Sequence, residues 1–245
     1  MERFYADSIS FGGFAMRTVL ISCLLLTVVQ FLAIAEDAEI PQEMNGLPLV
    51  FSEDFESGRD NWVETDPNAW KIVEEDGNHV FSNFQSSQYE PPVRSPHNIA
   101  RIKDLEVSDF VIEVKMKQTG REYGHRDQCI FYGYNDPAHF YYTHLATKAD
   151  EHANSIFLVN GEPRVSIAEE RTDGTQWTDA YHTIRIERDT AAGTILVYFD
   201  DMTKPVMKAT DTTFLSGGIG FGSFDDVGNI DDVRVWGKKV GENKP

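Results

Sequence analysis

Cysteine is almost absent from this chain. Its 245 residues include two cysteines, Cys23 and Cys129, and Cys23 lies in a segment that we expect to be removed. A single remaining thiol cannot form an intramolecular disulfide, which excludes the small disulfide-stabilised architectures. Cys129 lies in an apolar strand pattern, so we interpret it as a small buried hydrophobe, with a reactive thiol as the alternative. Stability must then come from a hydrophobic core.

Basic residues are also few. The chain has 22 lysines and arginines against 40 acids, which gives a net charge of −18. Such a surface repels nucleic acid and anionic membranes, so neither is an expected partner. It suits an exported soluble protein, a cation-binding protein or one with a neutral ligand. An anionic polysaccharide would need a local basic patch.

A long apolar run occurs once, near the N-terminus. Arg17 precedes the apolar residues 19–34, and Ala33-Ile34-Ala35 fits the small-residue pattern of a cleavage site. We therefore predict a signal peptide over residues 1–35, with Met16 as an alternative start. After processing no membrane span is expected, and the mature protein should be secreted, either periplasmic or extracellular.

No segment has the periodicity of an amphipathic helix. Instead, short runs of β-branched and aromatic residues alternate with polar ones between Gly, Asn, Asp and Pro clusters. The predicted strands lie at residues 49–55, 70–74, 79–82, 99–102, 109–118, 128–134, 140–146, 155–159, 164–167, 182–188, 194–199, 217–222 and 229–235. This spacing predicts an all-β fold, a two-sheet antiparallel jelly-roll sandwich. Residues 36–48 are predicted to form a flexible leader, 49–237 the sandwich and 238–245 a solvated tail.

The segment 139–160 is the most informative part of the chain. It holds three of the seven histidines, which are His139, His144 and His152. Burying such groups without partners costs several kcal/mol each, so we expect them to face water, a ligand or one another. Strand alternation puts Phe140, Tyr142 and His144 on one face. Since the opposite face also carries aromatic rings, we expect a central strand with one face on the core and the other lining a concavity.

Several short motifs occur in an order that is informative as a set. They are FSEDF at 51–55, NW at 61–62, FVIEV at 110–114, HTIRI at 182–186, ILVYFDD at 195–201, GIGFGSF at 218–224 and IDDVRV at 230–235. Over residues 49–237 this order resembles the concanavalin A-like lectin/glucanase superfamily, especially laminin-G-like and keto-disaccharide-hydrolase-like (DUF1080-type) domains of secreted bacterial proteins. The resemblance implies a jelly-roll sandwich whose concave face meets carbohydrate. A fold-level analogy establishes no activity by itself.

The sequence lacks the acid triplet of the commonest enzymes with that fold. Family-16-type glucanases place Glu-x-Asp-x-Glu on one strand face, so that all three carboxylates reach the cleft. Here the acids at 74–76 lie beside a turn, and those at 187 and 189 have no third partner. Two-carboxylate hydrolysis through that motif is therefore not expected.

Polar segments at strand ends supply the predicted site. If their strands are neighbours on the concave sheet, arginine, histidine, lysine and tyrosine converge on a groove that suits a saccharide and could accept a carboxylate or sulfate. The predicted substrate-binding residues are Arg94, His97, Arg126, Asp127, Lys148, His152, Asn154 and Trp177. His144 and Tyr142 are the candidate catalytic pair for lyase or acid/base chemistry. A metal site through His144, His152 and Asp150 is an alternative, and for each histidine alone a surface role is the simpler interpretation.

Glu53 and Asp231 lie near the two ends of the predicted sandwich, on core-facing strand phases. Two such carboxylates repel one another unless a cation or a proton lies between them. Domains of the resembling families often hold a structural calcium where the first and last strands meet, which implies calcium at this pair, and oxygen ligands suit that ion. The alternative is that both acids are solvated at strand ends. No organic cofactor is expected.

We therefore predict an exported sandwich that binds a poly- or oligosaccharide on its concave face. A carbohydrate-active enzyme, either a glycoside hydrolase or a polysaccharide lyase, is the first alternative. A structural or adhesion protein of the cell envelope is the second.

Overall fold

The computed structural model describes residues 39–241, and these residues form strands joined by turns and loops. The predicted signal peptide and the end of the predicted tail lie outside the described residues. One short 3-10 helix, η1 (Pro67–Ala69), interrupts the strands. Within residues 39–241 no helix is long and apolar enough to cross a membrane.

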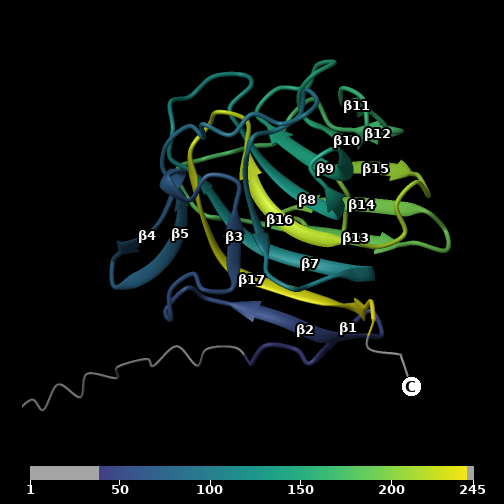
Figure 1. The fold of residues 1–245 in the computed structure, drawn as a ribbon, viewed down its shortest axis with the longest axis horizontal. Helices are drawn as coiled ribbons and strands as arrows, with labels where there is room; N and C mark the ends of the chain where they lie inside the picture. Colours follow the sequence, from purple (N-terminus) through teal and green to yellow (C-terminus); the bar gives the residue numbers. More distant parts are fainter. Residues whose placement is uncertain (1–38, 242–245) are drawn as a thin grey trace, which may run out of the picture. The chain divides into compact units, whose positions relative to one another are not determined.

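The larger sheet has ten strands, and Figure 1 shows it with β7 near its centre. Its main order is β1-β2-β17-β7-β13-β14-β15-β12, while β5 pairs with β17 and β4 pairs with β5. The strands are β1 (Glu43–Met44), β2 (Leu47–Glu53), β4 (Trp70–Glu75), β5 (Asn78–Asn83), β7 (Val107–Gln118), β12 (Glu170–Arg171), β13 (His182–Asp189), β14 (Thr194–Phe199), β15 (Met207–Thr210) and β17 (Gly228–Lys239).

The smaller sheet has seven strands in the order β11-β10-β9-β8-β16-β6-β3. The strands are β3 (Trp62–Glu64), β6 (Asn98–Ile102), β8 (Asp127–Asp136), β9 (His139–Ala146), β10 (Ser155–Asn160), β11 (Val165–Ser166) and β16 (Gly218–Ser223). The pairings within it are antiparallel. The predicted two-sheet antiparallel sandwich is therefore confirmed, and each predicted strand coincides with an observed one.

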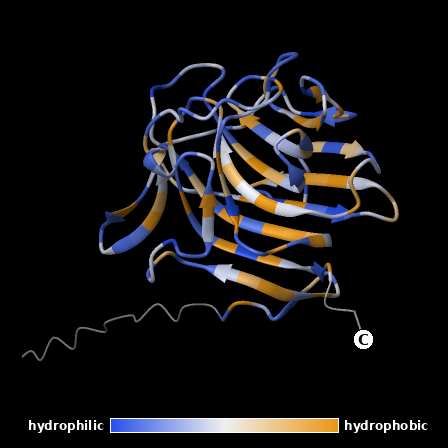
Figure 2. Cartoon of the chain, in the orientation of Figure 1, coloured by the Kyte–Doolittle hydropathy of each residue, from blue (hydrophilic) through white to orange (hydrophobic). Residues whose placement is uncertain are grey.

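Strand alternation builds the core between the two sheets. On β7 the side chains of Phe110, Ile112 and Val114 are buried in this core, and Ile184 and Ile186 of β13 pack beside them. The intervening positions on these strands carry polar groups such as the Arg185–Glu113 ion pair. Figure 2 shows the same alternation as orange and blue bands along the strands. The predicted phase of both strands is confirmed.

The outer face of the seven-stranded sheet carries a second apolar cluster, which we call the outer cluster. It consists of Ile99, Cys129, Phe131, Tyr134, Phe140, Tyr142, Phe157 and Val159, none of which is more than 7% exposed. Residues 84–97, the covering segment, join β5 to β6 and contribute Val93 to this cluster. The backbone N–H of Arg164 donates to the carbonyl of Arg94 (3.2 Å), which fastens the covering segment beside β11.

The outer cluster corrects one expectation. Phe140 and Tyr142 were expected to line an open concavity, but both are fully buried. The physical reason is that aromatic rings on both faces of β9 each need cover from water, and the covering segment supplies it on the outer side. Cys129 is buried there as a free thiol, as its strand pattern indicates.

The sandwich also begins and ends beyond the predicted bounds. Asn45 and Gly46 both have positive φ, 53° and 77°, so they form the tight turn of a β1–β2 hairpin inside the predicted leader. Ile40 and Met44 pack against the buried Trp236 of β17. The Trp236 indole N–H donates to the carbonyl of Pro41 (2.7 Å). Residues 40–48 thus belong to the domain, and β17 extends into the predicted tail.

We expect a chain that begins at Pro48 to melt several degrees below a matched chain that begins at Glu39. It loses the packing of Ile40, Met44 and Leu47 on Trp236. Fully burying one such side chain stabilises a fold by about 1.5–3 kcal/mol, so removing three partly buried ones should lower the free energy of unfolding by about 2–4 kcal/mol. Each kcal/mol corresponds to about 2–4 °C in melting temperature for a domain of this size. Thermal denaturation measures the difference. Equal melting temperatures would show that residues 40–47 are the loose leader predicted from sequence.

Candidate functional site

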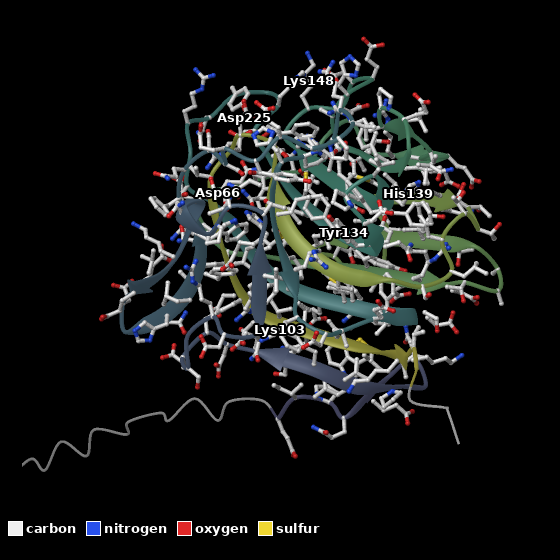
Figure 3. All side chains as sticks on the ribbon, viewed as in Figure 1. Asp66, Lys103, Tyr134, His139, Lys148 and Asp225 are labelled. Carbon is white, nitrogen blue, oxygen red and sulfur yellow. The ribbon has the colours of Figure 1, made fainter. Side chains whose placement is uncertain are left out.

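A cavity of about 420 Å³ lies at one end of the seven-stranded sheet, on its outer side, and we call it the rim cavity. Its lining consists of Arg94, Tyr123, His125, Asp127, His144, His152, Ala153, Arg164, Phe224 and Asp225. Because β8 begins where β9 ends and β10 begins, the antiparallel order brings Asp127, His144 and Ala153 to the same end of the sheet. Figure 3 shows Asp225 and Lys148 at this end and Lys103 at the opposite one.

Arginines form one wall of the rim cavity. The guanidinium of Arg164 lies over the Phe224 ring at 4.3 Å and the Phe157 ring at 5.3 Å, measured to the ring centroids. Its Nη2 donates to the carbonyl of His152 (3.3 Å), whereas Nη1 is buried and has no hydrogen-bond partner within residues 39–241. Arg94 is exposed and extends from the covering segment. The stacked rings fix the position of the Arg164 guanidinium.

Carboxyl groups form the opposite wall. Oxygens of Asp127, Asp225 and Asp226 lie within 4.8 Å of one another. Asp226 Oδ2 accepts from the Tyr123 hydroxyl (2.6 Å) and from the Asp127 backbone N–H (3.1 Å). Asp127 is 1% exposed, and burial, followed by its hydrogen bond to Asp226 and the charge of that group, raises its pKa well above the ordinary value. Burial therefore favours the uncharged form of the Asp127 carboxyl group.

His144 is neutral beside this carboxyl group. Its Nδ1 accepts from the Asn154 backbone N–H (3.3 Å), so its proton is on Nε2, which lies 3.4 Å from Asp127 Oδ2. Burial, with the charges of Arg164 and His125, lowers the pKa of His144 to about 3. The Cys129 thiol donates to the same Asp127 oxygen (3.1 Å), and burial raises its pKa well above the ordinary value. Cys129 is thus a thiol hydrogen-bond donor.

The remaining two histidines of the rim cavity lie on loops and are half exposed. His125 pairs with Asp150, and the His152 backbone N–H donates to the same carboxylate (2.7 Å). The His152 ring lies 3.3 Å from Glu151. Asp150 therefore ties the β9–β10 loop to the β7–β8 loop, and both imidazoles reach solvent at the mouth of the cavity.

The predicted site residues divide into three groups. Arg94, Asp127, His144 and His152 line the rim cavity together. Arg126 and Trp177 line a separate cavity of about 300 Å³ with Glu122, Tyr123 and Thr147. His97, Lys148 and Asn154 line neither of these two cavities.

Contacts explain these three exceptions. The His97 ring packs edge-on against Phe224 behind the wall, with a centroid distance of 6.3 Å. Lys148 donates its backbone N–H to the carbonyl of Gly124 (2.9 Å) and exposes its side chain. Asn154 is fully buried with φ of 51°, and its side-chain amide donates to the carbonyl of Thr172 (3.0 Å). It is a structural residue of the β9–β10 loop.

Of the candidate catalytic pair, His144 reaches the rim cavity and Tyr142 lies below it. The Tyr142 ring is stacked between Phe131 and Phe157. Its hydroxyl is buried without a hydrogen-bond partner among the described residues, and burial raises its pKa well above the ordinary value. A phenol in this setting is a poor proton acceptor.

Sequence reasoning missed Arg164, Phe224, Asp225 and Asp226. The signal for the last three is the Phe-Asp-Asp segment directly after the glycine-rich β16, where a turn brings two acids to the start of β8. Arg164 was assigned to the start of a strand. Its position becomes informative only once Phe157 and Phe224 are known to flank it.

The predicted calcium ligands are each hydrogen-bonded to N–H groups. Glu53 accepts from the Phe55 backbone (3.1 Å) and from the Asn61 side chain (2.9 Å). Asp231 accepts from the side chain of Asn78 (3.0 Å) and from the backbone of its neighbour at 232 (2.8 Å). A calcium ion needs six to eight oxygen ligands, and N–H donors directed at both carboxylates do not fit that requirement.

On this geometry we expect a chelator to leave the melting temperature unchanged. A lower melting temperature in chelator, restored by added calcium and abolished by Glu53→Gln, would instead uphold the calcium prediction. Thermal denaturation with and without millimolar calcium measures it. Asp54→Asn, a neighbouring exposed acid, is the matched control.

The replacement Asp127→Asn tests the uncharged carboxyl group. A folded-state pKa above the unfolded value of about 3.9 contributes stability at low pH that is lost as the pH rises through the folded pKa. Asparagine never ionises and its amide can still donate to Asp226. The parent should therefore lose stability relative to the variant between pH 4 and pH 8, by about 1.4 kcal/mol of unfolding free energy for each unit by which the folded-state pKa is raised. The melting temperature of the variant minus that of the parent should grow by several degrees over the same range. Asp225→Asn, at an exposed position, should show a much smaller trend, and a difference independent of pH would contradict the assignment.

A third cavity, of about 350 Å³, lies over the ten-stranded sheet and is lined by residues of the β1–β2 turn, β7, β13 and β14. Its cations have partners within the chain. Lys238 pairs with Asp109 (2.6 Å), and Arg188 donates to the carbonyl of Gly193 (2.6 Å). This cavity offers fewer uncommitted groups than the rim cavity.

Comparison with known proteins identifies the fold. No protein-family model and no curated protein matches the sequence. The carbohydrate binding module CBM66 from Bacillus subtilis superposes with a TM-score of 0.50 and 15% identity, covering 72% of this chain and 95% of that one. Domain 4 of AbnA, a GH43 extracellular arabinanase from Geobacillus stearothermophilus solved with arabinotriose, gives 0.51 and 12% identity, covering 78% and 93%. Peanut lectin gives 0.50 and 10% identity, covering 78% and 98%. The chain therefore has a lectin-like β-sandwich fold.

Proposed function

We propose that this domain binds a poly- or oligosaccharide in the rim cavity. The observation that carries the proposal is the cavity itself. Its volume of about 420 Å³ lies within the usual range for small-molecule sites, about 300–1,000 Å³. Its lining combines the aromatic rings of Tyr123 and Phe224 with planar hydrogen-bonding groups, which is the inventory that sugars require.

The chemistry of each wall suits sugar hydroxyls. The exposed carboxylate of Asp225 offers acceptors and the Asp127 carboxyl group offers a donor and acceptors. The imidazoles of His125 and His152 are half exposed at the mouth. Phe224 is partly exposed and adds apolar surface to the cavity, with the Arg164 guanidinium over its ring. The groups differ in donor and acceptor character, as a polyhydroxylated ligand requires.

The likeness to carbohydrate-binding domains supports this proposal at the level of the fold. The resemblance to laminin-G-like and keto-disaccharide-hydrolase-like domains and the apolar N-terminal run support export to the periplasm or the extracellular space. The proposed site is at the rim of the outer face, because the middle of that face is filled by the outer cluster.

Binding to a glycan array, followed by titration calorimetry, tests the proposal. We expect Phe224→Ala to lower the affinity for a bound glycan about tenfold or more, which is about 1.4 kcal/mol. Lys103→Gln, at the opposite end of the sheet (Figure 3), should leave it unchanged. An equal loss in both variants, or no glycan bound by the parent chain, would contradict the proposal and favour an adhesion or structural role.

Glycoside hydrolysis is a second candidate function, and the carboxyl groups of Asp127 and Asp225 in the rim cavity favour it. Asp127, a buried carboxyl group whose pKa is raised by burial, has an oxygen within 4.8 Å of an oxygen of the exposed Asp225. Retaining glycosidases use an acid and a nucleophile about 5–5.5 Å apart. If this pair is catalytic, Asp127→Asn and Asp225→Asn should each abolish release of reducing ends while leaving glycan affinity within a fewfold of the parent. Persistent release in both variants would exclude the pair.

A further inference from the structure

The rim cavity contains two guanidinium groups that have no anionic partner. Neither Arg94 nor Arg164 forms an ion pair with a carboxylate among residues 39–241, whereas Arg185, Lys117 and Lys238 pair with Glu113, Glu75 and Asp109. The chain has 40 acids and 22 bases. In so acidic a protein, two arginines that line one cavity and form no ion pair with a carboxylate are poorly explained by stability alone.

Arg164 is held ready for a ligand. Its guanidinium is fixed by the Phe224 and Phe157 rings, and its Nη1 is a buried donor without an acceptor among the described residues. Buried N–H groups are nearly always satisfied, and the residue that carries this unsatisfied one lines the rim cavity. A planar, pre-organised guanidinium suits a bidentate oxyanion better than a single hydroxyl.

Arg94 converges on the same place. The hydrogen bond between the Arg164 backbone N–H and the Arg94 carbonyl (3.2 Å) joins the two residues directly. Below them lies Tyr142, whose buried hydroxyl has no partner among the described residues and is influenced by the charges of both arginines and of Asp127. Two like charges above one unsatisfied hydroxyl repel each other, and an anion between them would relieve that repulsion.

The acid wall limits how much negative charge the ligand can carry. Asp225 is exposed and lines the cavity, and burial favours the uncharged form of Asp127 by raising its pKa. A ligand with an anionic group on its arginine side and hydroxyls on its aspartate side complements both walls. A densely charged polyanion would be repelled by Asp225 and by the net charge of −18.

We propose that the saccharide bound in the rim cavity is a uronic acid derivative whose carboxylate lies between Arg94 and Arg164, with the hydroxyls of the sugar ring on Asp127 and Asp225. This inference rests on the proposed saccharide-binding function and narrows its ligand to an acidic sugar. A sulfate ester shares the oxyanion chemistry, and the experiment separates it from the carboxylate.

The test uses matched ligands. Uronate-containing oligosaccharides of several linkages are titrated into the full chain, each beside the neutral oligosaccharide obtained from it by carboxyl reduction and beside a sulfated chain. We expect at least one uronate to bind tenfold or more tightly than its reduced counterpart. Its affinity should fall with added salt, because the contact is ionic. Equal affinity for reduced and unreduced forms, or a preference for the sulfated chain, would overturn the carboxylate assignment.

Variants locate the contact. Arg94→Gln, at an exposed position, and Arg164→Gln should each lower the affinity for the uronate about tenfold or more and leave that for the reduced sugar nearly unchanged. Arg164→Lys, which keeps the charge without the planar fork, should recover part of the loss. The control Lys103→Gln should leave the affinity for both ligands unchanged. Equal losses for both ligands would show a structural role for the arginines. Failure of every sugar, neutral or acidic, to bind would instead refute the proposed function itself.

Discussion

The aromatic rings on both faces of β9 are the constraint on which the rest of the structure depends. Tyr141 faces the core between the sheets, and Phe140 and Tyr142 face outward. A strand with one apolar face needs a single partner layer, whereas this strand needs two. The ten-stranded sheet supplies the first layer and the covering segment supplies the second. Because that segment crosses the outer face, Arg94 lies beside Arg164. The covered middle of the face is filled by the outer cluster, so the proposed site lies at the rim.

The electrostatics of the rim follow from the same burial. Asp127, Cys129 and His144 share the outward phase of β8 and β9 with the aromatic residues, so they are withdrawn from water to nearly the same extent. Burial favours the uncharged form of each: it raises the pKa of the carboxyl group and of the thiol, and it lowers the pKa of the imidazole. The charges of the rim cavity are instead carried by residues from loops and turns, namely Arg94, Arg164 and Asp225. Neutral groups from strands form its floor and charged groups from loops its walls.

The sequence predicted the fold in detail because period-two alternation is a local signal. The phases of β7 and β13 could be read from Phe110 to Met116 and from Ile184 to Ile186, and the structure agrees with both. The short strands β1, β3, β12 and β15 were not predicted, since two to four residues are too few to show alternation. The β1–β2 hairpin was missed although Asn45-Gly46 is a strong hairpin signal, because residues 36–48 were assigned to a flexible leader.

The site was predicted only in part, for a physical reason. Four of the proposed residues do share a cavity, because strand ends gather at one edge of an antiparallel sheet. Which loops fold over that edge depends on contacts distant in sequence, such as Arg164 with Phe224 and Asp226 with Tyr123. Apolar residues on both faces of β9 suggested that one face lines an open concavity, but the structure has the buried outer cluster there. The sequence of the strand alone does not distinguish an open aromatic surface from a covered one.

The pairing of β2 with the last strand, β17, has a practical consequence for handling the molecule. The strand β1 and the end of β17 both lie at the edge of the ten-stranded sheet that β2 forms with them, while Asp225 lies at the other end of the domain (Figures 1 and 3). A tag, a surface tether or a fused reporter joined at either of these positions would leave the mouth of the cavity facing solution. The domain is therefore suited to oriented immobilisation, with long polymers free to approach from the untethered side.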